Sequence, residues 1–260
     1  MSDAAAVRDT TVVRPRRNPG ARRILFCLGF CGGGTGAYLP WTAAVPDDTE
    51  LAAICYPGRE GRFTEEFAAD WEELVQDSLS AVLSAADRPY VLFGHSLGGW
   101  MAFDLAVRIK ECGGRAPDSV VVSSANSPRR QLDGHDMWPN SPREGHSDAE
   151  LMGWMQSFGL IPQHALDDPD LREMALDLMR ADLHVRDSFT YRAGSALDVP
   201  LQLFTGESDE VIEPNTADHW RELARGGFRH DVLPGSHFYT PQVWASLPGM
   251  ISALGSRQGT

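Results

Sequence analysis

Short apolar runs alternate with longer amphipathic segments along most of this chain. Residues 24–28 and 51–55 are apolar runs of strand length, and each is closely followed by a glycine or a proline that ends it. Residues 70–85 instead carry an apolar side chain every three or four positions, which is the spacing of a helix with one buried face. The pattern therefore predicts two strands followed by a helix.

The same alternation continues towards the end of the chain. Further strands are predicted at residues 90–93, 119–123, 201–204 and 229–233, and further helices at residues 97–112, 216–224 and 243–254. Strands separated by helices imply a mostly parallel central sheet flanked by helices on both faces, which is an α/β protein. Right-handed crossovers then bring functional side chains together at the carboxyl ends of the strands.

Residues 130–192 interrupt this rhythm. Prolines and Gly145 punctuate the first part, and three amphipathic segments follow at residues 148–158, 169–179 and 183–191. An insertion at this point lies above the carboxyl edge of the sheet, so we expect a helical lid over the site. Helices packed on the core are the alternative. Apolar, deformable lid residues such as Met152, Trp154 and Met155 would suit an acyl-chain groove.

The remaining residues divide into a tail and a core. Residues 1–20 contain prolines and lack periodicity, so we expect a flexible N-terminal tail. Residues 21–129 and 193–260 would then form one folded core around the insertion. The tail also lacks the apolar stretch of a secretory signal, and no apolar run is long enough to span a membrane. We therefore expect a cytoplasmic protein, and a monomer.

Charge and cysteine content exclude several classes of function. The chain has 36 Asp and Glu against 23 Lys and Arg, which gives a formal net charge of -13. Because phosphate groups are repelled by such a surface, binding to nucleic acid or to an anionic membrane is not expected. The four cysteines show neither zinc-ligand nor redox-motif spacing, so no metal is expected. We expect no cofactor either.

The most specific chemical signal is a serine between two glycines. Gly94, Ser96 and Gly98 form a G-x-S-x-G motif that follows a predicted strand and opens a predicted helix. This strand–turn–helix context is the nucleophile elbow of the α/β-hydrolase fold, in which small residues leave room for a sharp turn. Ser96 is therefore the candidate nucleophile.

A serine hydroxyl needs a base, and the base needs an orienting acid, in the chain order serine, acid, histidine. Among eight histidines, His237 is best placed, because it follows the predicted strand at 229–233 and precedes the last helix. Asp209 follows the strand at 201–204 and is the candidate acid, with Glu207 as its main rival. A turn residue that stabilises its own backbone is the structural alternative for Asp209.

Two backbone amides are needed to stabilise the tetrahedral intermediate. Leu97, directly after the serine, supplies one, and we assign the other to Cys31 in the glycine-rich loop after the first strand. A phosphate-binding loop is the alternative, but the lysine and spacing of that motif are absent. Nothing near Cys31 predicts a lowered pKa, so the thiol is a poor candidate nucleophile.

These motifs together resemble the type II thioesterases that accompany polyketide synthases and nonribosomal peptide synthetases. The resemblance spans residues 24–254 and includes a P-G-R-x-x-R segment at 57–62 and an R-A-D segment at 180–182. It implies an editing enzyme that hydrolyses aberrant or stalled acyl groups from the phosphopantetheine arm of acyl or peptidyl carrier proteins. Met152, Met155 and Phe238 are the candidate substrate-binding residues.

The chain departs from the family at two places. Gly29 and Cys31 stand where the family usually has a proline and a small residue, and residues 123–128 lack its usual arginine. Product release, acyl transfer and carboxylesterase activity with the same triad remain open, as does a non-catalytic binding role. An acidic carrier would need a local basic patch on this acidic chain, for which Arg129 and Arg130 are candidates.

Overall fold

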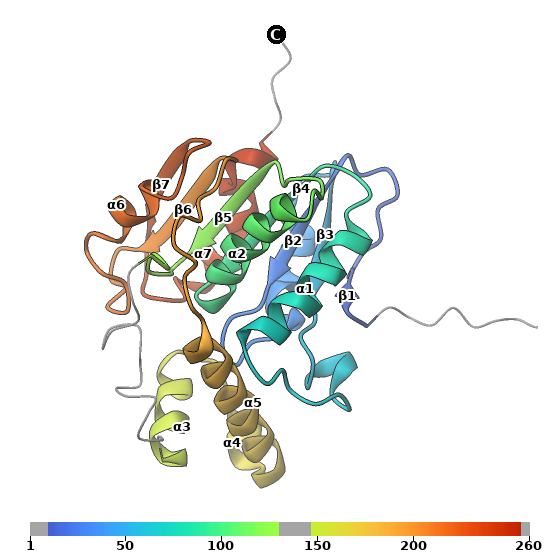
Figure 1. Ribbon diagram of the computed structural model, residues 1–260. Helices are drawn as coiled ribbons and strands as arrows, with labels where there is room; N and C mark the ends of the chain where they lie inside the picture. Colours follow the sequence, from blue (N-terminus) through green and yellow to red (C-terminus); the bar gives the residue numbers. More distant parts are fainter. Residues whose placement is uncertain (1–9, 130–146, 256–260) are drawn as a thin grey trace, which may run out of the picture.

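The computed structural model describes residues 10–129 and 147–255 and shows one central sheet (Figure 1). Its order is β1-β3-β2-β4-β5-β6-β7, with β1 antiparallel to β3 and every other neighbouring pair parallel. The strands are β1 Val12–Val13, β2 Arg23–Leu28, β3 Thr49–Ile54, β4 Tyr90–His95, β5 Ser119–Ser123, β6 Leu201–Gly206 and β7 Phe228–Leu233. The predicted mostly parallel sheet is confirmed.

Helices flank this sheet on both faces, as predicted. The α-helices are α1 Trp71–Ala85, α2 Leu97–Glu111, α3 Asp148–Ser157, α4 Gln163–Asp167, α5 Pro169–Ser188, α6 Thr216–Arg221 and α7 Pro241–Ser246. The 3-10 helices are η1 Thr35–Ala43, η2 Glu60–Arg62, η3 Leu247–Met250 and η4 Ser252–Leu254. None of the helices in the described part of the chain is long and apolar enough to cross a membrane.

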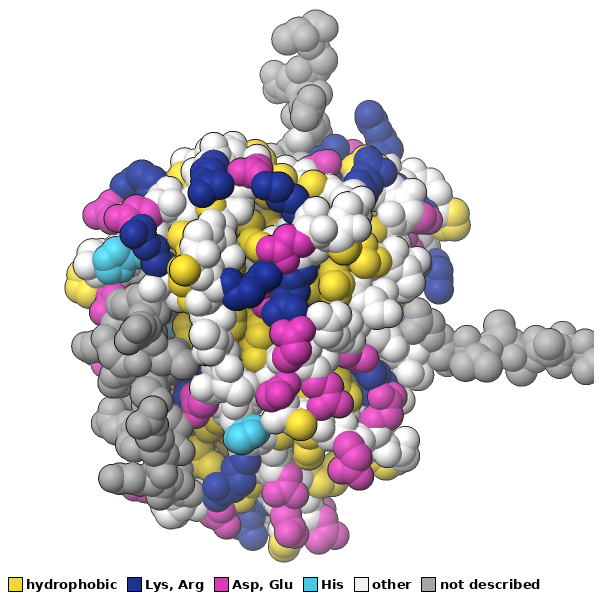
Figure 2. Space-filling view, in the orientation of Figure 1, with side chains coloured by type: hydrophobic (Ala, Val, Ile, Leu, Met, Phe, Trp, Pro, Cys, Tyr) yellow, Lys and Arg dark blue, Asp and Glu magenta, His cyan; other side chains and the backbone are white. Residues whose placement is uncertain are grey.

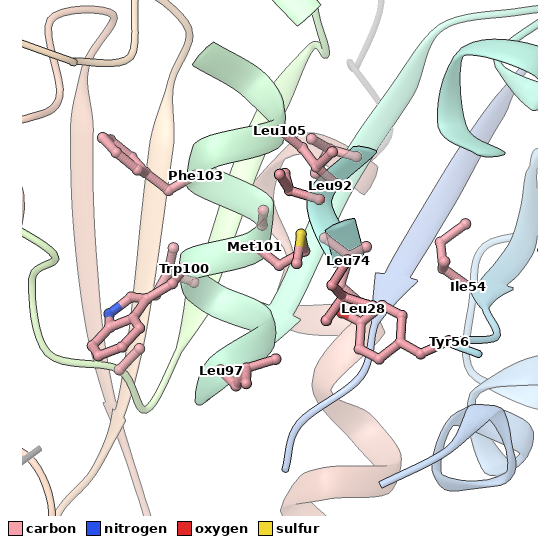
Figure 3. Packing of buried hydrophobic residues seen from close by; sticks show 14 of the residues in the cluster. Leu28, Ile54, Tyr56, Leu74, Leu92, Leu97, Trp100, Met101, Phe103 and Leu105 are labelled. Carbon is pink, nitrogen blue, oxygen red and sulfur yellow. The ribbon is translucent and has the colours of Figure 1, made fainter. Parts of the chain in front are cut away.

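Two hydrophobic clusters lie on opposite faces of the sheet, because successive side chains of a strand point to opposite sides. In β2, Ile24 and Phe26 belong to the cluster under α1 and α2, whereas Leu25 and Cys27 belong to the cluster under η1 and α7. Figure 3 shows the first cluster, in which Met101 of α2 points towards Leu92 of β4. Packing of α2 against β4 and β5 fixes the end of the helix that carries the serine motif.

The helices α3, α4 and α5 form an insertion between β5 and β6 and lie beyond the carboxyl ends of the strands (Figure 1). The sequence predicts two segments where the structure has the single helix α5, since no proline or glycine interrupts the chain after Pro169. Asp168 caps its first turn by accepting from the amides of Asp170 and Leu171. This long helix packs against α1, α3 and α4 and so joins the insertion to the core.

Two predictions about the ends of the chain need correction. The expected flexible tail contributes a strand in its described part, because Val12 pairs with Ile54 and is buried. The expected last helix at residues 243–254 is broken into α7 and two 3-10 turns. Pro248 lacks a backbone N–H, so it cannot continue the hydrogen-bond ladder of α7.

Candidate active site

Ser96 sits in a strained turn between β4 and α2. Its backbone has φ 53° and ψ -122°, a conformation that a residue with a side chain rarely adopts. A Cβ atom on Gly94 would overlap the carbonyl of Gly98, and one on Gly98 would overlap the carbonyl of Leu28. The two glycines therefore allow the close approach that this turn requires, as the sequence motif indicates.

His237 and Asp209 form a buried pair next to this turn. The Nδ1 atom of His237 lies 3.1 Å from Oδ2 and 3.2 Å from Oδ1 of Asp209, and the two side chains are 4% and 1% exposed. An imidazole with its proton on Nδ1 donates to this carboxylate and leaves Nε2 as an acceptor. The rival acid Glu207 is exposed, so Asp209 is the acid that the fold brings to His237.

Ser96 and His237 line the same small cavity at the carboxyl edge of the sheet, with a volume of about 60 Å³. The rest of its lining comes from both the core and the insertion: Cys31, Leu97, Trp100, Ser124, Ala125, Asn126, Trp154, Leu183, Arg186, Val211 and Ile212. Ligand pockets usually have volumes of about 300–1,000 Å³. The cavity therefore holds the reacting atoms but leaves no room for a long acyl chain.

The amides of Leu97 and Cys31 are available as hydrogen-bond donors at this cavity. Within the described residues, neither N–H donates to another group of the chain. The neighbouring amide of Gly32, in contrast, donates to Asp182 Oδ2 at 2.8 Å. The two amides predicted from the sequence are thus free to bind an oxyanion, whereas the amide of Gly32 is already hydrogen-bonded to Asp182.

The predicted substrate-binding residues are not brought together at the cavity. Met155 is 2% exposed and belongs to the hydrophobic core, and Met152 packs against that core. Phe238 packs against Phe30 and Phe158, with ring centroids 5.0 and 5.7 Å apart. None of the three is among the described residues that line the cavity.

Other apolar side chains take that place. Trp154 was expected in an acyl-chain groove and does line the cavity, whereas Trp100, Val211 and Ile212 were missed. Trp100 lies one helical turn after Ser96, so it faces the same side of α2, and this spacing could have identified it. Val211 and Ile212 closely follow Asp209 in the sequence. Once Asp209 is placed at the site, apolar residues this close to it are candidates for the cavity wall.

The insertion covers the candidate base. Phe158, directly after α3, packs edge-on against His237 with ring centroids 5.8 Å apart, and Trp154 packs against Phe158 at 5.1 Å. Leu183 and Arg186 of α5 complete this side of the cavity, where Arg186 pairs with Asp187 at 2.7 Å. The cavity is therefore bounded by the insertion as well as by the core.

His95 lies beneath His237, with ring centroids 5.0 Å apart, and does not line the cavity. Its Nδ1 atom is 3.0 Å from Ser123 Oγ, which in turn is 2.7 Å from the hydroxyl of Tyr239. Burial and the nearby His237 lower the pKa of His95 well below its usual range. His95 is therefore a neutral, structural neighbour of the candidate base.

Cys31 carries a buried thiol beside Ser96, and burial raises its pKa to about 12. Burial also raises the pKa of Cys55 to about 11 and that of Cys27 well above its usual range, whereas Cys112 is exposed. Because the thiolate is the reactive form, the three buried thiols are inert below these values. The described residues contain no cluster of His, Cys, Asp or Glu suited to a metal ion.

Iodoacetamide should therefore modify Cys112 alone in the folded protein, and hydrolytic activity should be retained. Cys112 is exposed and should be modified at each pH tested, while Cys31, whose pKa burial raises to about 12, should stay unmodified up to at least pH 9. Intact-protein mass spectrometry with peptide mapping measures both. The unfolded chain, in which all four cysteines react, is the control. Rapid labelling of Cys31 with loss of activity would contradict this expectation.

The comparisons with known proteins agree on one family. A family model described as "Thioesterase domain" matches residues 23–256. The gramicidin S biosynthesis protein GrsT of Aneurinibacillus migulanus is 26% identical over 224 residues, which are 85% of this chain and 84% of GrsT. The AMB antimetabolite synthetase AmbE of Pseudomonas aeruginosa is 35% identical over 213 residues, which are 82% of this chain but only 10% of AmbE.

A solved structure resembles this chain over almost its whole length. The type II thioesterase BorB from the borrelidin biosynthetic cluster superposes with a TM-score of 0.80 at 30% identity, covering 95% of this chain and 98% of BorB.

Proposed function

Because this chain belongs to the thioesterase domain family, we propose that it is a type II editing enzyme of polyketide or nonribosomal peptide biosynthesis. It is a thioester hydrolase, and its substrates would be aberrant or stalled acyl groups on the phosphopantetheine arms of carrier proteins. The observation that carries this proposal is that His237, buried and paired with Asp209, lines one cavity with Ser96, on a chain similar to BorB.

The mechanism follows from the positions of these groups. Ser96 Oγ attacks the thioester carbonyl while Nε2 of His237 accepts its proton, and Asp209 stabilises the resulting imidazolium. The amides of Leu97 and Cys31 bind the oxyanion, and each such donor is typically worth about 2.7–4 kcal/mol in the transition state. The C–S bond then breaks, and His237 returns the proton to the departing thiolate.

The second half of the reaction uses the same groups. His237 accepts a proton from a water molecule, which attacks the acyl-serine ester. The tetrahedral intermediate collapses, the proton passes to Ser96 Oγ, and the free acid leaves. No cofactor takes part in either half.

We assign residues 130–192 the role of a lid and residues 21–129 and 193–260 that of the catalytic core. Trp154 and Leu183 bring the insertion into the cavity wall, and Phe158 covers His237. Since about 60 Å³ leaves no room for an acyl-pantetheine arm, binding of substrate requires the insertion to shift. The described part of the lid consists of α3, α4 and α5.

The partner would be an acyl or peptidyl carrier protein, and the negative charge of this chain limits where an acidic carrier can dock. On the face in Figure 2, acidic side chains gather over the insertion and the adjacent end of α1. An acidic carrier would be repelled there and would need a basic patch elsewhere. Arg129, one candidate for that patch, already pairs with Glu222, and Arg130 lies outside the described residues.

The substrate class is tested by comparing the hydrolysis of three substrates that share one acyl group. They are the acylated carrier protein, acyl-pantetheine, and an oxygen ester of matched size. We expect kcat/KM to decrease in that order, because thioester chemistry and carrier docking each contribute. Mass spectrometry of the carrier follows the first substrate, and thiol release follows the second.

Equal or faster hydrolysis of the oxygen ester would contradict the proposal and favour a carboxylesterase. Product release and acyl transfer are less favoured, since the full-length structural relative BorB is a type II thioesterase.

A further inference from the structure

The lid helix α5 places a buried carboxylate against the loop that carries the predicted oxyanion donor. Asp182 is 3% exposed and lies in the second half of α5. One of its oxygens accepts from the amide of Gly32 at 2.8 Å and from Arg59 Nη1 at 2.9 Å. The other accepts from Arg59 Nη2 at 2.6 Å. A charged group of the insertion therefore bonds directly to the backbone one residue after Cys31.

Arg59 completes this attachment from the core side. Its guanidinium is held bidentately by Asp182, and Nη1 also donates to the carbonyl of Gly33 at 2.9 Å. Gly32 has φ 73°, and a Cβ atom there would overlap the end of Met179, which also belongs to α5. The loop at residues 31–33 is thus bound by hydrogen bonds to its amide and carbonyl and covered by α5.

We propose that Asp182 and Arg59 are positioning residues that orient the amide of Cys31. The Gly32 amide and the Gly33 carbonyl are fixed on either side of the Gly33 amide, which donates to the carbonyl of Phe30 at 2.8 Å. That carbonyl shares its peptide plane with the Cys31 N–H, so the attachment sets the direction of this N–H. The oxyanion site is then complete only while α5 is docked on the core. This inference rests on the proposed function, in which the Cys31 amide binds the oxyanion.

A neighbouring arginine, Arg62, offers a matched comparison with Arg59. Arg62 lies three residues after Arg59, is also 7% exposed, and is held by two carboxylates. Within the described residues, its side chain donates to Glu65, Asp77 and the carbonyl of Cys55, and none of these hydrogen bonds reaches residues 31–33. A variant of Arg62 therefore removes a buried arginine and its two ion pairs from the same segment without loosening the oxyanion loop.

The test compares Asp182→Asn with Arg62→Gln and with the double variant Arg59→Leu/Asp182→Leu. The double variant removes both buried charges together, which avoids leaving one charge unpaired and preserves folding better than a single deletion. We expect kcat on acyl-pantetheine to fall about 10- to 100-fold in Asp182→Asn and in the double variant, since loss of one oxyanion donor costs about 10²- to 10³-fold. KM should change less than about threefold, and Arg62→Gln should keep the parental kcat.

Two inhibitors separate positioning from general damage. A trifluoromethyl ketone analogue of acyl-pantetheine forms a tetrahedral adduct with the serine, so its Ki should rise in proportion to the loss of kcat/KM. An amide analogue binds without forming an oxyanion, so its Kd should stay within about threefold of the parental value. Circular dichroism melting establishes that each variant is folded at the assay temperature.

Parental kcat in either folded Asp182 variant would overturn the inference. An equal loss of kcat in Arg62→Gln, or a loss confined to KM, would overturn it as well. Failure of the proposed function is distinguished separately, since in that case the parental enzyme would hydrolyse the matched oxygen ester at least as fast as the thioester, whatever Asp182→Asn does.

Discussion

Replacing Ser96 with Ala should lower kcat for thioester hydrolysis by about 10⁶-fold, the loss typical when the nucleophile of a serine triad is removed. The hydroxyl is the group that becomes acylated, and no other described side chain of the cavity offers a reactive nucleophile, since burial raises the pKa of Cys31 to about 12. Alanine keeps the Cβ atom and the strained backbone of the elbow, so the melting temperature should change little.

The measurement is mass spectrometry of an acyl carrier protein after incubation with parental enzyme or with Ser96→Ala. The parental enzyme should release the acyl group, whereas the carrier should stay loaded with the variant. Ser124→Ala is the matched control, because Ser124 also lines the cavity and also has a positive φ of 46°, but its hydroxyl bonds to Tyr239. Unchanged unloading by folded Ser96→Ala would remove the nucleophile from the mechanism.

Asp209→Asn should lower kcat by about 10⁴-fold. The amide nitrogen of asparagine would donate to Nδ1 of His237, so the ring proton would move to Nε2, where the mechanism needs an acceptor. The shape of the site would be kept, because Asn and Asp have nearly the same size and both can accept from the amide of Val211. The effect is measured as kcat with saturating acyl-pantetheine.

Glu207→Gln provides the control for this prediction. Glu207 is exposed, so the kcat of Glu207→Gln should stay within about twofold of the parental value. If Asp209→Asn kept its activity while Glu207→Gln lost it, Glu207 and not Asp209 would be the acid of the triad.

The sequence predicts the elements of the site that depend on local geometry. The serine motif requires a strand, a tight turn and a helix, and each can be recognised within a few residues. Asp209 and His237 were identified because the order of strands fixes which loops reach the carboxyl edge of the sheet. The structure places these two side chains 3.1 Å apart although 28 residues separate them.

Contacts between distant segments could not be predicted in this way. Arg59 and Asp182 are separated by 123 positions, and no periodicity of either segment indicates that they meet. The strand β1 has only two residues, which is too short for an alternating pattern to be visible. Met152 and Met155 have the right chemistry for an acyl groove, but the rotation of α3 about its axis decides which of its side chains reaches the cavity.

The small volume of the cavity has a consequence for the fate of the acyl-serine ester. Trp100, Trp154 and Leu183 bound a space of only about 60 Å³ beside Ser96, which a water molecule enters more easily than a sizeable alcohol or amine. The apolar wall that the insertion adds to the cavity therefore favours the smallest nucleophile in solution during deacylation. Partitioning between hydrolysis and alcoholysis should accordingly favour the free acid even at high alcohol concentration, with methanol intercepting the ester more readily than propanol.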